Sequence, residues 1–278
     1  MDFSSFEISS EDLKYIADMV YDNSGIVFRD SNLSVLKSRL SFKLKEKNLT
    51  SHDYLKLLKN DRHELLSFID FVTTNFTSFF RNPKQFEILK QIVLPDLINR
   101  NKNEKFVKLW SAGCATGEEP YTMMMITFRF FEENGLFKDN WSFFIVASDI
   151  SLESLFIARE GKFPEKSVQK IEPYYFEKFF IKLDDHYQIK EEYKKWVKFD
   201  YHNLIYDNGI RDIDVAFCRN VLIYFDEDIQ KKVIYNIYES MKEKGYLFLG
   251  HSESLIGLFN GFKPVSSEKG IYYVRAKG

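Results

Sequence analysis

The segment "SAGCATGEEPYT" (residues 111–122) constrains the fold more than any other part of the sequence. It follows the apolar run 106–110 and precedes a helical pattern, so it lies where a strand turns into a helix. Gly113 and Gly117 allow the backbone to approach a ligand closely, and Pro120 suits the first turn of a helix. A strand, a glycine-containing turn and a helix in this order are typical of a nucleotide-binding α/β fold.

Two acidic residues of this segment limit what the turn can bind. Glu118 and Glu119 stand where such a turn would otherwise bind phosphate. Like charges about 4 Å apart cost several kcal/mol when partly desolvated, so a dinucleotide diphosphate is disfavoured and a ligand with a cationic end is favoured. A loop that merely needs small residues is the alternative interpretation.

The segment "FFIVASDIS" ends a hydrophobic strand at Asp149. In this position a carboxylate can accept hydrogen bonds from both hydroxyls of a ribose. S-adenosylmethionine has an adenosine, an ammonium, a sulfonium and one small anion, so it matches a turn that carries acids and no phosphate cradle. The alternative for Asp149 is an ordinary cap of the following helix.

A third strand end, in "DIDVAFCRNVLIYF", carries polar side chains. Arg219 and Asn220 follow the apolar strand at its carboxyl end, where open α/β sheets bind ligands, and Tyr224 lies four residues beyond Asn220. The alternatives are a surface ion pair for Arg219 and a core position for Tyr224. The Pro-Pro pair that nucleobase amino-methyltransferases carry at this strand end is missing, which weakens a DNA-modifying interpretation.

The chain divides into a helical part and an α/β part. Up to about residue 75, apolar residues recur at helical spacing, which predicts four short helices packed as a bundle. Further on, apolar runs alternate with helical stretches and predict a parallel sheet covered by helices. These runs, with the last predicted strand, are 106–110, 143–147, 214–218, 246–249 and "GIYYVRA". We therefore expect a helical domain at 1–75 and an α/β domain at 76–278.

Two finer features follow from the same pattern. Asn82 is expected to be an N-cap and Pro83 the first residue of a helix. In residues 173–198 the alternation in "FFIKL" and "YQIK" around an Asp-Asp turn predicts a small antiparallel hairpin inserted into the α/β domain.

Composition disfavours several classes of protein. The formal charge of −2 over 278 residues lacks the basic excess of nucleic-acid binding. The N-terminal segment is acidic without an apolar signal core, and the most apolar stretch, which contains Arg129, is too short to span a bilayer. Cys114 and Cys218 have no CxxC neighbour, so the sequence indicates neither a disulfide framework nor a zinc site. A reducing cytoplasm is therefore the simplest setting for the protein. The five histidines are scattered without the spacing of metal ligands, so we expect no metal site. Most of them are expected at the surface or in caps, although His251 in "GHSES" follows a strand and is a candidate to support the site.

Six motifs together resemble the CheR-type chemoreceptor glutamate methyltransferases. In order they are "TTNFTSFFR", "WSAGCATGEEPYT", "ASDIS", "FDYHNL", "FCRNVLIYFD" and "GYLFLGHSESL". The resemblance covers nearly the whole chain. It implies a helical N-terminal domain and a Rossmann-like methyltransferase domain of class I with an inserted β-subdomain.

The resemblance also implies an activity. The family transfers a methyl group from S-adenosylmethionine to glutamate side chains of chemoreceptor helices and releases S-adenosylhomocysteine. Arg81 and Tyr224 match the positions that face the reacting methyl group. The implied cofactor-binding residues are Asn75, Thr77, Arg81, Glu119, Asp149, Asn203, Leu204, Arg219 and Asn220. The protein is then expected to be a cytoplasmic monomer that is recruited to membrane receptor arrays.

A basic helical segment is the candidate docking surface. Arg39, Lys43 and Lys47 repeat every four residues, aided by Lys37 and Lys45. The alternative interpretation is a helix face that is exposed to solvent and binds no partner. Because receptor methylation regions are glutamate-rich helices, the resemblance favours docking. Family members that tether to a receptor C-terminal pentapeptide have a glycine-bearing loop in the β-subdomain, whereas "KLDDHYQ" has no glycine, so we expect an enzyme without this tether.

Two other functions stay open at this point. One is an adaptor that binds S-adenosylmethionine with little or no turnover. The other is a nicotinamide-dependent oxidoreductase, which the two loop acids and the missing phosphate cradle disfavour.

Overall fold

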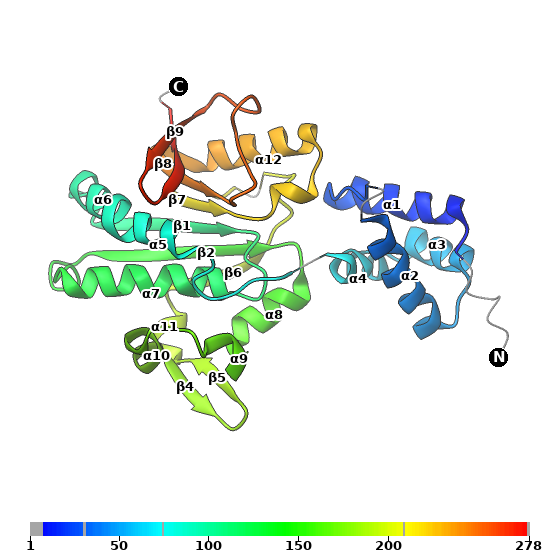
Figure 1. The fold of residues 1–278 in the computed structure, drawn as a ribbon, viewed down its shortest axis with the longest axis horizontal. Coiled ribbons are helices and arrows are strands. Elements are labelled where there is room, and N and C mark those ends of the chain that lie inside the picture. Colours follow the sequence, from blue (N-terminus) through cyan, green and yellow to red (C-terminus); the bar gives the residue numbers. More distant parts are fainter. Residues whose placement is uncertain (1–7, 30–31, 74, 208, 277–278) are drawn as a thin grey trace. The chain divides into compact units, whose positions relative to one another are not determined.

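The computed structural model describes residues 8–29, 32–73, 75–207 and 209–276. The chain forms two compact units, shown as a ribbon in Figure 1. The helical unit comprises Met1–Thr74 and a short second segment, Tyr224–Ile229. The catalytic unit comprises Asn75–Ile223 and Gln230–Gly278. No sequence pattern marked the second segment of the helical unit.

The helical unit contains the four helices that the apolar spacing predicts. They are α1 (Ser10–Ser24), α2 (Leu33–Lys47), α3 (Ser51–Asn60) and α4 (Arg62–Val72). Side chains of Ser9, Thr50 and Asp61 accept hydrogen bonds from backbone N–H groups and begin three of them. The leucine stripe of α2 is buried in the unit, as its spacing indicates.

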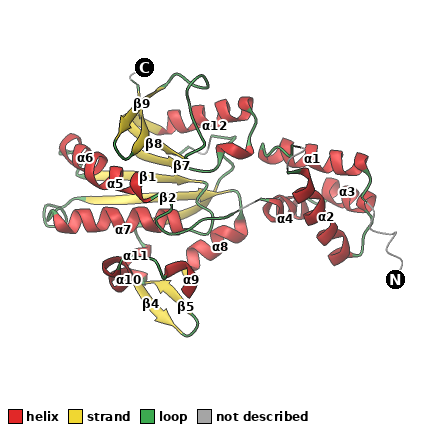
Figure 2. Ribbon diagram, in the orientation of Figure 1, coloured by secondary structure: helices red, strands yellow, loops and turns green. Residues whose placement is uncertain are grey.

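A seven-stranded sheet forms the centre of the catalytic unit (Figure 2). Its order is β6-β2-β1-β7-β8-β10-β9, with β6 to β8 parallel and β10 and β9 antiparallel. The strands are β1 (Phe106–Ala112), β2 (Ser142–Asp149), β6 (Val197–Tyr201), β7 (Ile213–Cys218), β8 (Met241–Leu249), β9 (Phe262–Ser267) and β10 (Gly270–Arg275). The predicted Rossmann-like core is therefore present.

Helices flank this sheet and place the connecting turns at its edge. They are α5 (Pro83–Ile88), the π-helix η2 (Leu89–Val93), α6 (Leu94–Arg100), α7 (Glu118–Glu133), α8 (Leu152–Glu160), the 3₁₀ turn η3 (Leu222–Tyr224) and α12 (Glu227–Ser240). Helix α7 packs against β1 and β2, and its three consecutive methionines are all buried. A helix that is apolar around much of its circumference belongs to the interior, which explains the run "MMMITF".

The inserted β-subdomain is a second sheet with strand order β3-β5-β4. Strands β4 (Phe180–Leu183) and β5 (His186–Ile189) form the predicted hairpin around the Asp184–Asp185 turn. The third strand, β3 (Lys162–Pro164), lies upstream of the predicted insert. The remaining elements of this region are α9 (Glu165–Val168), α10 (Pro173–Phe179) and α11 (Glu191–Lys194).

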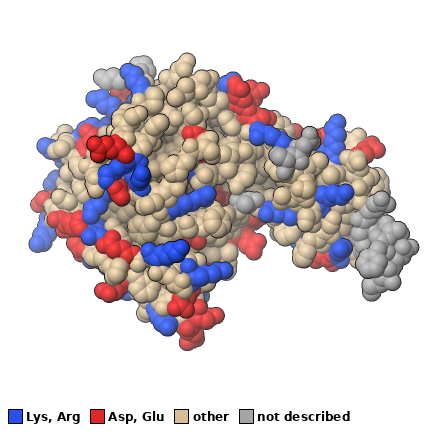
Figure 3. Space-filling model, in the orientation of Figure 1, with Lys and Arg blue, Asp and Glu red and all other residues tan. Residues whose placement is uncertain are grey.

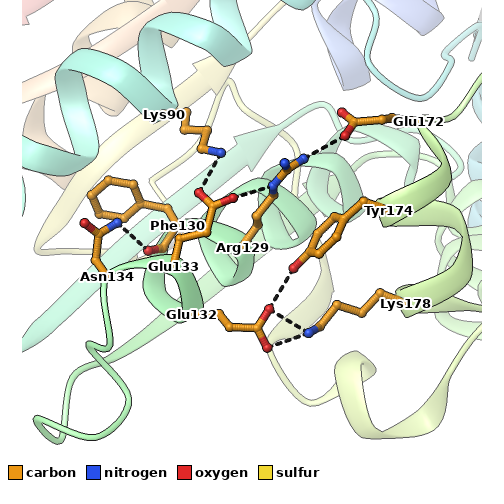
Figure 4. Close-up of polar contacts among 9 residues, drawn as sticks. All are labelled: Lys90, Arg129, Phe130, Glu132, Glu133, Asn134, Glu172, Tyr174 and Lys178. Carbon is orange, nitrogen blue, oxygen red and sulfur yellow. Dashed lines mark hydrogen bonds and ion pairs between the residues drawn. The ribbon is translucent and has the colours of Figure 1, made fainter.

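Ion pairs and hydrogen bonds join α10 to α7 (Figure 4). The Glu132 carboxylate accepts a hydrogen bond of 2.7 Å from the Tyr174 hydroxyl and pairs with Lys178 at 2.5 Å. Arg129 pairs with Glu172 at 2.9 Å, and its guanidinium lies 4.3 Å from the centre of the Tyr174 ring. These contacts hold the β-subdomain against the main fold.

Two details of the sequence prediction are wrong. Residues 197 and 198 belong to β6 of the main sheet, because Val197 pairs with Ile145 of β2, and not to the inserted hairpin. Strand β9 was missed, since Pro264 and two serines obscure its pattern. Asn82 is the N-cap of α5 and Pro83 its first residue, as predicted, although Asn82 has a φ of 60° and its side chain makes no capping hydrogen bond.

Candidate active site

The predicted site residues of the catalytic unit gather where parallel strands end. Strands β1, β2, β7 and β8 are neighbours in the sheet, so the turns that follow them meet at one edge. Three of these strand ends carry residues that the sequence singled out: Gly113, Asp149 and Arg219. The fourth turn, after β8, contains His251, which the sequence singled out as a residue that supports the site.

Steric crowding explains both glycines of the first turn. Gly113 has a φ of +84°, and a Cβ added to it would lie 2.4 Å from Val221 Cγ2. Gly117 has a φ of +97°, and its Cβ would lie 2.9 Å from the Cβ of Ala158. Both the left-handed conformation and the lack of space exclude larger side chains. The turn therefore packs directly against the segment that follows β7.

The two loop acids are buried and hydrogen-bonded within the protein. Glu118 accepts a 2.6 Å hydrogen bond from the Thr116 hydroxyl. Glu119 accepts a 2.7 Å hydrogen bond from the Ser111 hydroxyl and lies 3.1 Å from Arg219 Nε. The charge of Glu119 is therefore matched by an arginine of the protein, which the sequence did not reveal.

Arg219 is buried, so it is not the surface ion pair of the alternative interpretation. Its guanidinium lies over the rings of Phe86 and Phe217, at 5.1 and 5.7 Å from their centres. Nη2 donates a 2.6 Å hydrogen bond to the carbonyl of Arg81. Nη1 is a buried donor that has no hydrogen-bond partner among the described residues.

In the Glu119–Arg219 pair, burial and the nearby positive charge shift the pKa of Glu119 in opposite directions. Removal from water raises the pKa of Glu119, whereas Arg219, the Ser111 hydroxyl and Arg81 act in the other direction. Burial also lowers the pKa of Arg219. The side chains of Arg81, Glu119 and Arg219 thus belong to one electrostatic cluster.

Asp149 ends β2 and is buried. Its two carboxylate oxygens accept backbone hydrogen bonds from Ala115, at 2.8 Å, and from Ser151, at 2.9 Å. Helix α8 is capped by the Ser151 hydroxyl, which accepts from the N–H of Ser154. The cap interpretation of Asp149 is therefore wrong, and its carboxylate instead ties the second strand end to the glycine turn.

The segment before α5 contributes Asn75, Thr77 and Arg81. Asn75 donates a 2.8 Å hydrogen bond to the Ser154 hydroxyl on α8, and Thr77 is half-buried. Arg81 Nη1 donates a 3.0 Å hydrogen bond to the carbonyl of Phe76. The arginine side chain is thereby folded back on its own segment.

The turn after β6 contributes Asn203 and Leu204, both buried. Asn203 Oδ1 accepts a 3.3 Å hydrogen bond from the Ile205 N–H, and the Leu204 carbonyl accepts one of 3.0 Å from Asn236. Next to them His202 is buried and stacks on Trp110, with ring centres 5.8 Å apart. The expectation of a surface or capping role is wrong for this histidine.

Asn220 and Tyr224 follow β7. Asn220 has a φ of 59°, and its buried Oδ1 has no hydrogen-bond partner among the described residues. Tyr224 ends η3 and groups with the helical unit, where its carbonyl accepts a 2.9 Å hydrogen bond from the Val27 N–H. The catalytic unit by itself therefore brings together the predicted residues other than Tyr224.

Family models match both units of the chain. The SAM-binding domain of CheR methyltransferase matches residues 75–271, and its all-alpha domain matches residues 11–73. The chain belongs to the CheR methyltransferase family. The chemotaxis protein methyltransferase of Borreliella burgdorferi is 35% identical over 91% of this chain and 91% of its own. Chemotaxis protein methyltransferase 1 of Pseudomonas aeruginosa is 33% identical over 91% of this chain and 93% of its own.

As a CheR-family protein, the chain is a methyltransferase that uses S-adenosylmethionine. The residues present fit this cofactor. Arg219 Nη1 and Asn220 Oδ1 are a buried donor and a buried acceptor without partners in the described part of the chain, and a ligand with polar groups would satisfy both. Asp149 stands at the second strand end, where a ribose binds in such folds.

One residue of the CheR site was missed by sequence reasoning. Glu253 lies in the turn after β8 and accepts hydrogen bonds from the backbone of Asn220 and Val221 at 2.9 Å. The motif "GHSES" had drawn attention to His251, which is exposed. The only available signal was an acidic residue just after a strand end.

The cysteines of this CheR protein are packing residues. Cys114 and Cys218 are fully buried, and burial raises the pKa of both thiols. A thiol that stays protonated is a poor nucleophile. Cys114 lies in the hydrophobic core of the catalytic unit.

The three predicted docking residues on α2 each have a partner within the helical unit. Arg39 donates hydrogen bonds to the carbonyls of Phe71, at 3.0 Å, and Thr73, at 2.7 Å. Lys43 pairs with Glu46 at 2.7 Å and Lys47 with Glu64 at 2.8 Å. Arg39 thus satisfies carbonyls at the end of α4, while Lys37 and Lys45 are exposed.

A cavity of about 430 Å³ lies apart from these residues, between α8, α11 and β6. It is lined by Tyr121, Phe144, Arg159, Lys194, Lys195, Val197, Lys198 and Phe199. Lys194 pairs with Glu191 and Lys198 with Asp200, so half of its cations are already neutralised. No predicted cofactor residue lines it, so it is not the cofactor site. Over the face drawn in Figure 3 both signs of charge are interspersed.

No helix among the described residues combines the length and the apolar character that crossing a bilayer requires.

Proposed function

We propose that this protein methylates glutamate side chains of chemoreceptor signalling helices, forming glutamate methyl esters and S-adenosylhomocysteine. The names of its relatives, which are chemotaxis protein methyltransferases, support a role in chemotaxis. The observation that carries the proposal is the cluster of Arg81, Glu119 and Arg219 at the strand edge. Two arginines against one carboxylate give this cluster a net positive charge beside the cofactor site, which suits an anionic acceptor.

The reaction requires little acid–base chemistry from the protein. A glutamate carboxylate is ionised at neutral pH and is already a nucleophile. S-adenosylmethionine, when bound, supplies an electrophilic methyl group on a sulfonium. The protein's contribution is alignment and the exclusion of water, and alignment contributes roughly 7–11 kcal/mol in favourable cases.

Two residues are proposed to face the reacting groups. Arg81 orients the incoming carboxylate or that of the cofactor, and Tyr224 contributes a hydrogen bond or ring contact near the methyl group. The position of the Arg81 guanidinium within the electrostatic cluster of the site supports its role. Full turnover of an Arg81→Ala variant at saturating substrate would refute this assignment.

The remaining cofactor-binding assignments are part of the same proposal. Glu119, Arg219 and Asn220 are proposed to bind the amino-acid end of the cofactor, and Asp149 its ribose. Asn75, Thr77, Asn203 and Leu204 complete the predicted set. Their burial or half-burial around the strand ends supports the grouping.

We propose that α2 docks on the glutamate-rich receptor helices. Arg39, Lys43 and Lys47 are held in place by their partners, and exposed Lys37 and Lys45 add to the positive charge. Five cations on the helix outnumber the two carboxylates that pair with them. Opposite charge accelerates encounter with an acidic partner and makes binding sensitive to salt.

The β-subdomain is proposed to act without a pentapeptide tether. Its β4–β5 turn consists of only Asp184 and Asp185, which supports this prediction. Calorimetry with a peptide that ends in a receptor C-terminal pentapeptide tests it. A saturable isotherm would overturn the prediction, whereas heats equal to those of dilution agree with it.

The central experiment is incubation of the protein with radiolabelled S-adenosylmethionine and receptor-containing membranes, followed by treatment with base. A glutamate methyl ester releases volatile methanol, and an N-methyl product does not. Binding of S-adenosylhomocysteine without any label transfer would instead identify an adaptor. Methanol release that is abolished by replacing the receptor glutamates with alanine would establish the acceptor.

Location and assembly complete the proposal. We propose that the protein acts in the cytoplasm as a monomer and is recruited to membrane receptor arrays. A fluorescent fusion should form polar or clustered foci that disperse in cells without receptors. Sedimentation should give a mass near the 33.1 kDa of one chain.

A further inference from the structure

The turn after β8 reaches back over the segment that follows β7. Strands β7 and β8 are parallel neighbours, and Cys218 pairs with Leu249, so both turns begin at the same edge of the sheet. Glu253 donates its N–H to the carbonyl of Gly250 at 3.0 Å, which closes a tight turn. Its side chain is thereby directed at the neighbouring segment.

The Glu253 carboxylate accepts backbone hydrogen bonds from both turns. Oε2 accepts from Asn220 at 2.9 Å and from Gly250 at 2.5 Å. Oε1 accepts from Val221 at 2.9 Å and from Ile223 at 3.4 Å. A carboxylate that accepts several N–H hydrogen bonds makes charge-assisted contacts, which are stronger than contacts between neutral groups. Glu253 thus fixes the backbone from residue 220 to residue 223.

Crowding around this carboxylate leaves little freedom. A Cβ added to Gly250 would lie 2.6 Å from Glu253 Oε2 and 2.9 Å from the backbone nitrogen of Asn220. Asn220 itself adopts a φ of 59°, a conformation that is costly without support. On the other side of the same segment, Val221 fills the space that a side chain at Gly113 would need.

We propose that Glu253 is a positioning residue: by binding the backbone of residues 220–223, it sets the geometry of the cofactor contacts at Arg219 and Asn220. This inference rests on the proposed assignment of those two residues to cofactor binding. The same carboxylate also accepts a hydrogen bond from the N–H of Ile223, the residue directly before Tyr224. Glu253 touches no reacting atom in this role.

A Glu253→Gln variant tests the proposal in the full-length protein. The amide keeps one acceptor oxygen and directs an NH₂ group at two backbone N–H donors, so at least two hydrogen bonds are lost. We expect the Kd for S-adenosylhomocysteine, measured by calorimetry, to rise by about tenfold. Glu268→Gln is the matched control, because it removes the same charge from the exposed β9–β10 turn, and its Kd should not change.

Hydrogen exchange distinguishes positioning from general destabilisation. The amides of Asn220, Val221 and Ile223 should exchange faster in Glu253→Gln, while the amides of β1 and β2 keep their protection. Glu253→Asp, which retains the charge but is one methylene shorter, should give an intermediate Kd. If Glu253→Gln does not fold, Glu253→Asp carries the test with the same readouts.

The outcomes separate this inference from the proposed function. An unchanged Kd, or faster exchange throughout the catalytic unit, would overturn the positioning role. Because S-adenosylhomocysteine binding needs no acceptor, the result does not depend on the methylated substrate. Failure of the wild-type protein to methylate receptors would refute the proposed function and leave the Glu253 result intact.

Discussion

His202 illustrates how one residue couples pH to stability. The ring is buried against Trp110, and Nε2 lies 2.9 Å from the Tyr206 carbonyl, so the neutral ring donates from Nε2. Burial lowers the pKa of His202 below its ordinary value of 6.5. As the pH falls below that value, the unfolded chain takes up a proton before the folded protein does. The stabilisation that the folded protein gains from keeping His202 neutral is therefore complete above pH 6.5, and it is lost as the pH falls through the lowered pKa.

We predict that His202→Gln removes this dependence. Between pH 6.5 and 5, the free energy of unfolding of the wild type should fall by up to about 1.4 kcal/mol per pH unit more than that of the variant. Urea unfolding at several pH values measures the difference. His251→Gln, at an exposed position, is the control and should follow the wild type. Parallel curves for wild type and His202→Gln would contradict the prediction.

The Glu119–Arg219 pair leads to a second prediction for individual residues. Arg219→Met removes one partner of a buried pair and leaves the Glu119 carboxylate without its charge partner. We expect the free energy of unfolding to fall by about 3–5 kcal/mol. The double variant Glu119→Gln, Arg219→Met should recover part of this loss, because no buried charge then remains. Chemical unfolding of the four proteins in the cycle measures the coupling, and strictly additive losses would argue against an energetic pair.

At the level of elements, the contacts between α7 and α10 locate the β-subdomain. Lys90 and Arg129 both contact Glu133, at 2.8 and 2.7 Å, which extends the network of Glu132 and Lys178 across α7 (Figure 4). These side chains are partly exposed, so each pair contributes little to the global free energy of unfolding. Their effect should instead appear in the local stability of the subdomain.

We predict that Glu132→Ala loosens the β-subdomain. The change removes the acceptor of Tyr174 and Lys178, so amides of α10, β4 and β5 should exchange faster. The global free energy of unfolding should fall by about 1 kcal/mol or less. Hydrogen exchange with mass spectrometry measures both effects, and Glu243→Ala, at an exposed position of β8, is the control. Equal exchange of the β4–β5 hairpin in both variants would show that the network does not hold it.

At the level of the whole molecule, charge is expected to govern the encounter with the receptor. Arg39 satisfies the carbonyls of Phe71 and Thr73, so its reversal would disturb the helical unit as well as any docking. Lys37 and Lys45 lie on the same helix and are exposed. They are therefore the better positions at which to test the docking surface without damage to the fold.

We predict that a Lys37→Glu, Lys45→Glu variant raises the KM for receptor by about threefold to tenfold at low salt. The effect should shrink as the ionic strength rises, because salt screens exposed charges. The Kd for S-adenosylhomocysteine should stay constant. Lys138→Glu, Lys170→Glu makes the same change in net charge at exposed positions of the catalytic unit and is the matched control. Equal KM values for the two variants would mean that net charge, and not α2, determines the encounter.

Most helices and strands could be predicted from local sequence, and so could a candidate cofactor site. Apolar spacing predicts α1 to α4 and strands β1, β2, β7, β8 and β10, because burial on one face or on both faces dictates local pattern. The glycines at 113 and 117 and the acid at 149 predict a cofactor site, because backbone conformation and charge constrain single residues strongly. The edge strands β6 and β9 were not predicted, because their side chains are less buried and the alternation of apolar residues along them is therefore weak.

Which charged groups form pairs could not be predicted from local sequence and depends on how the chain packs. Glu119 and Arg219 are a hundred positions apart in the chain, and nothing in either neighbourhood indicates that they form a buried pair. The same holds for Glu253, whose hydrogen bonds to residues 220–223 depend on the adjacency of β7 and β8. Pairing across a sheet is fixed by strand order, and strand order is a property of the packed molecule. Local sequence therefore specifies which groups are available, and the fold specifies their partners.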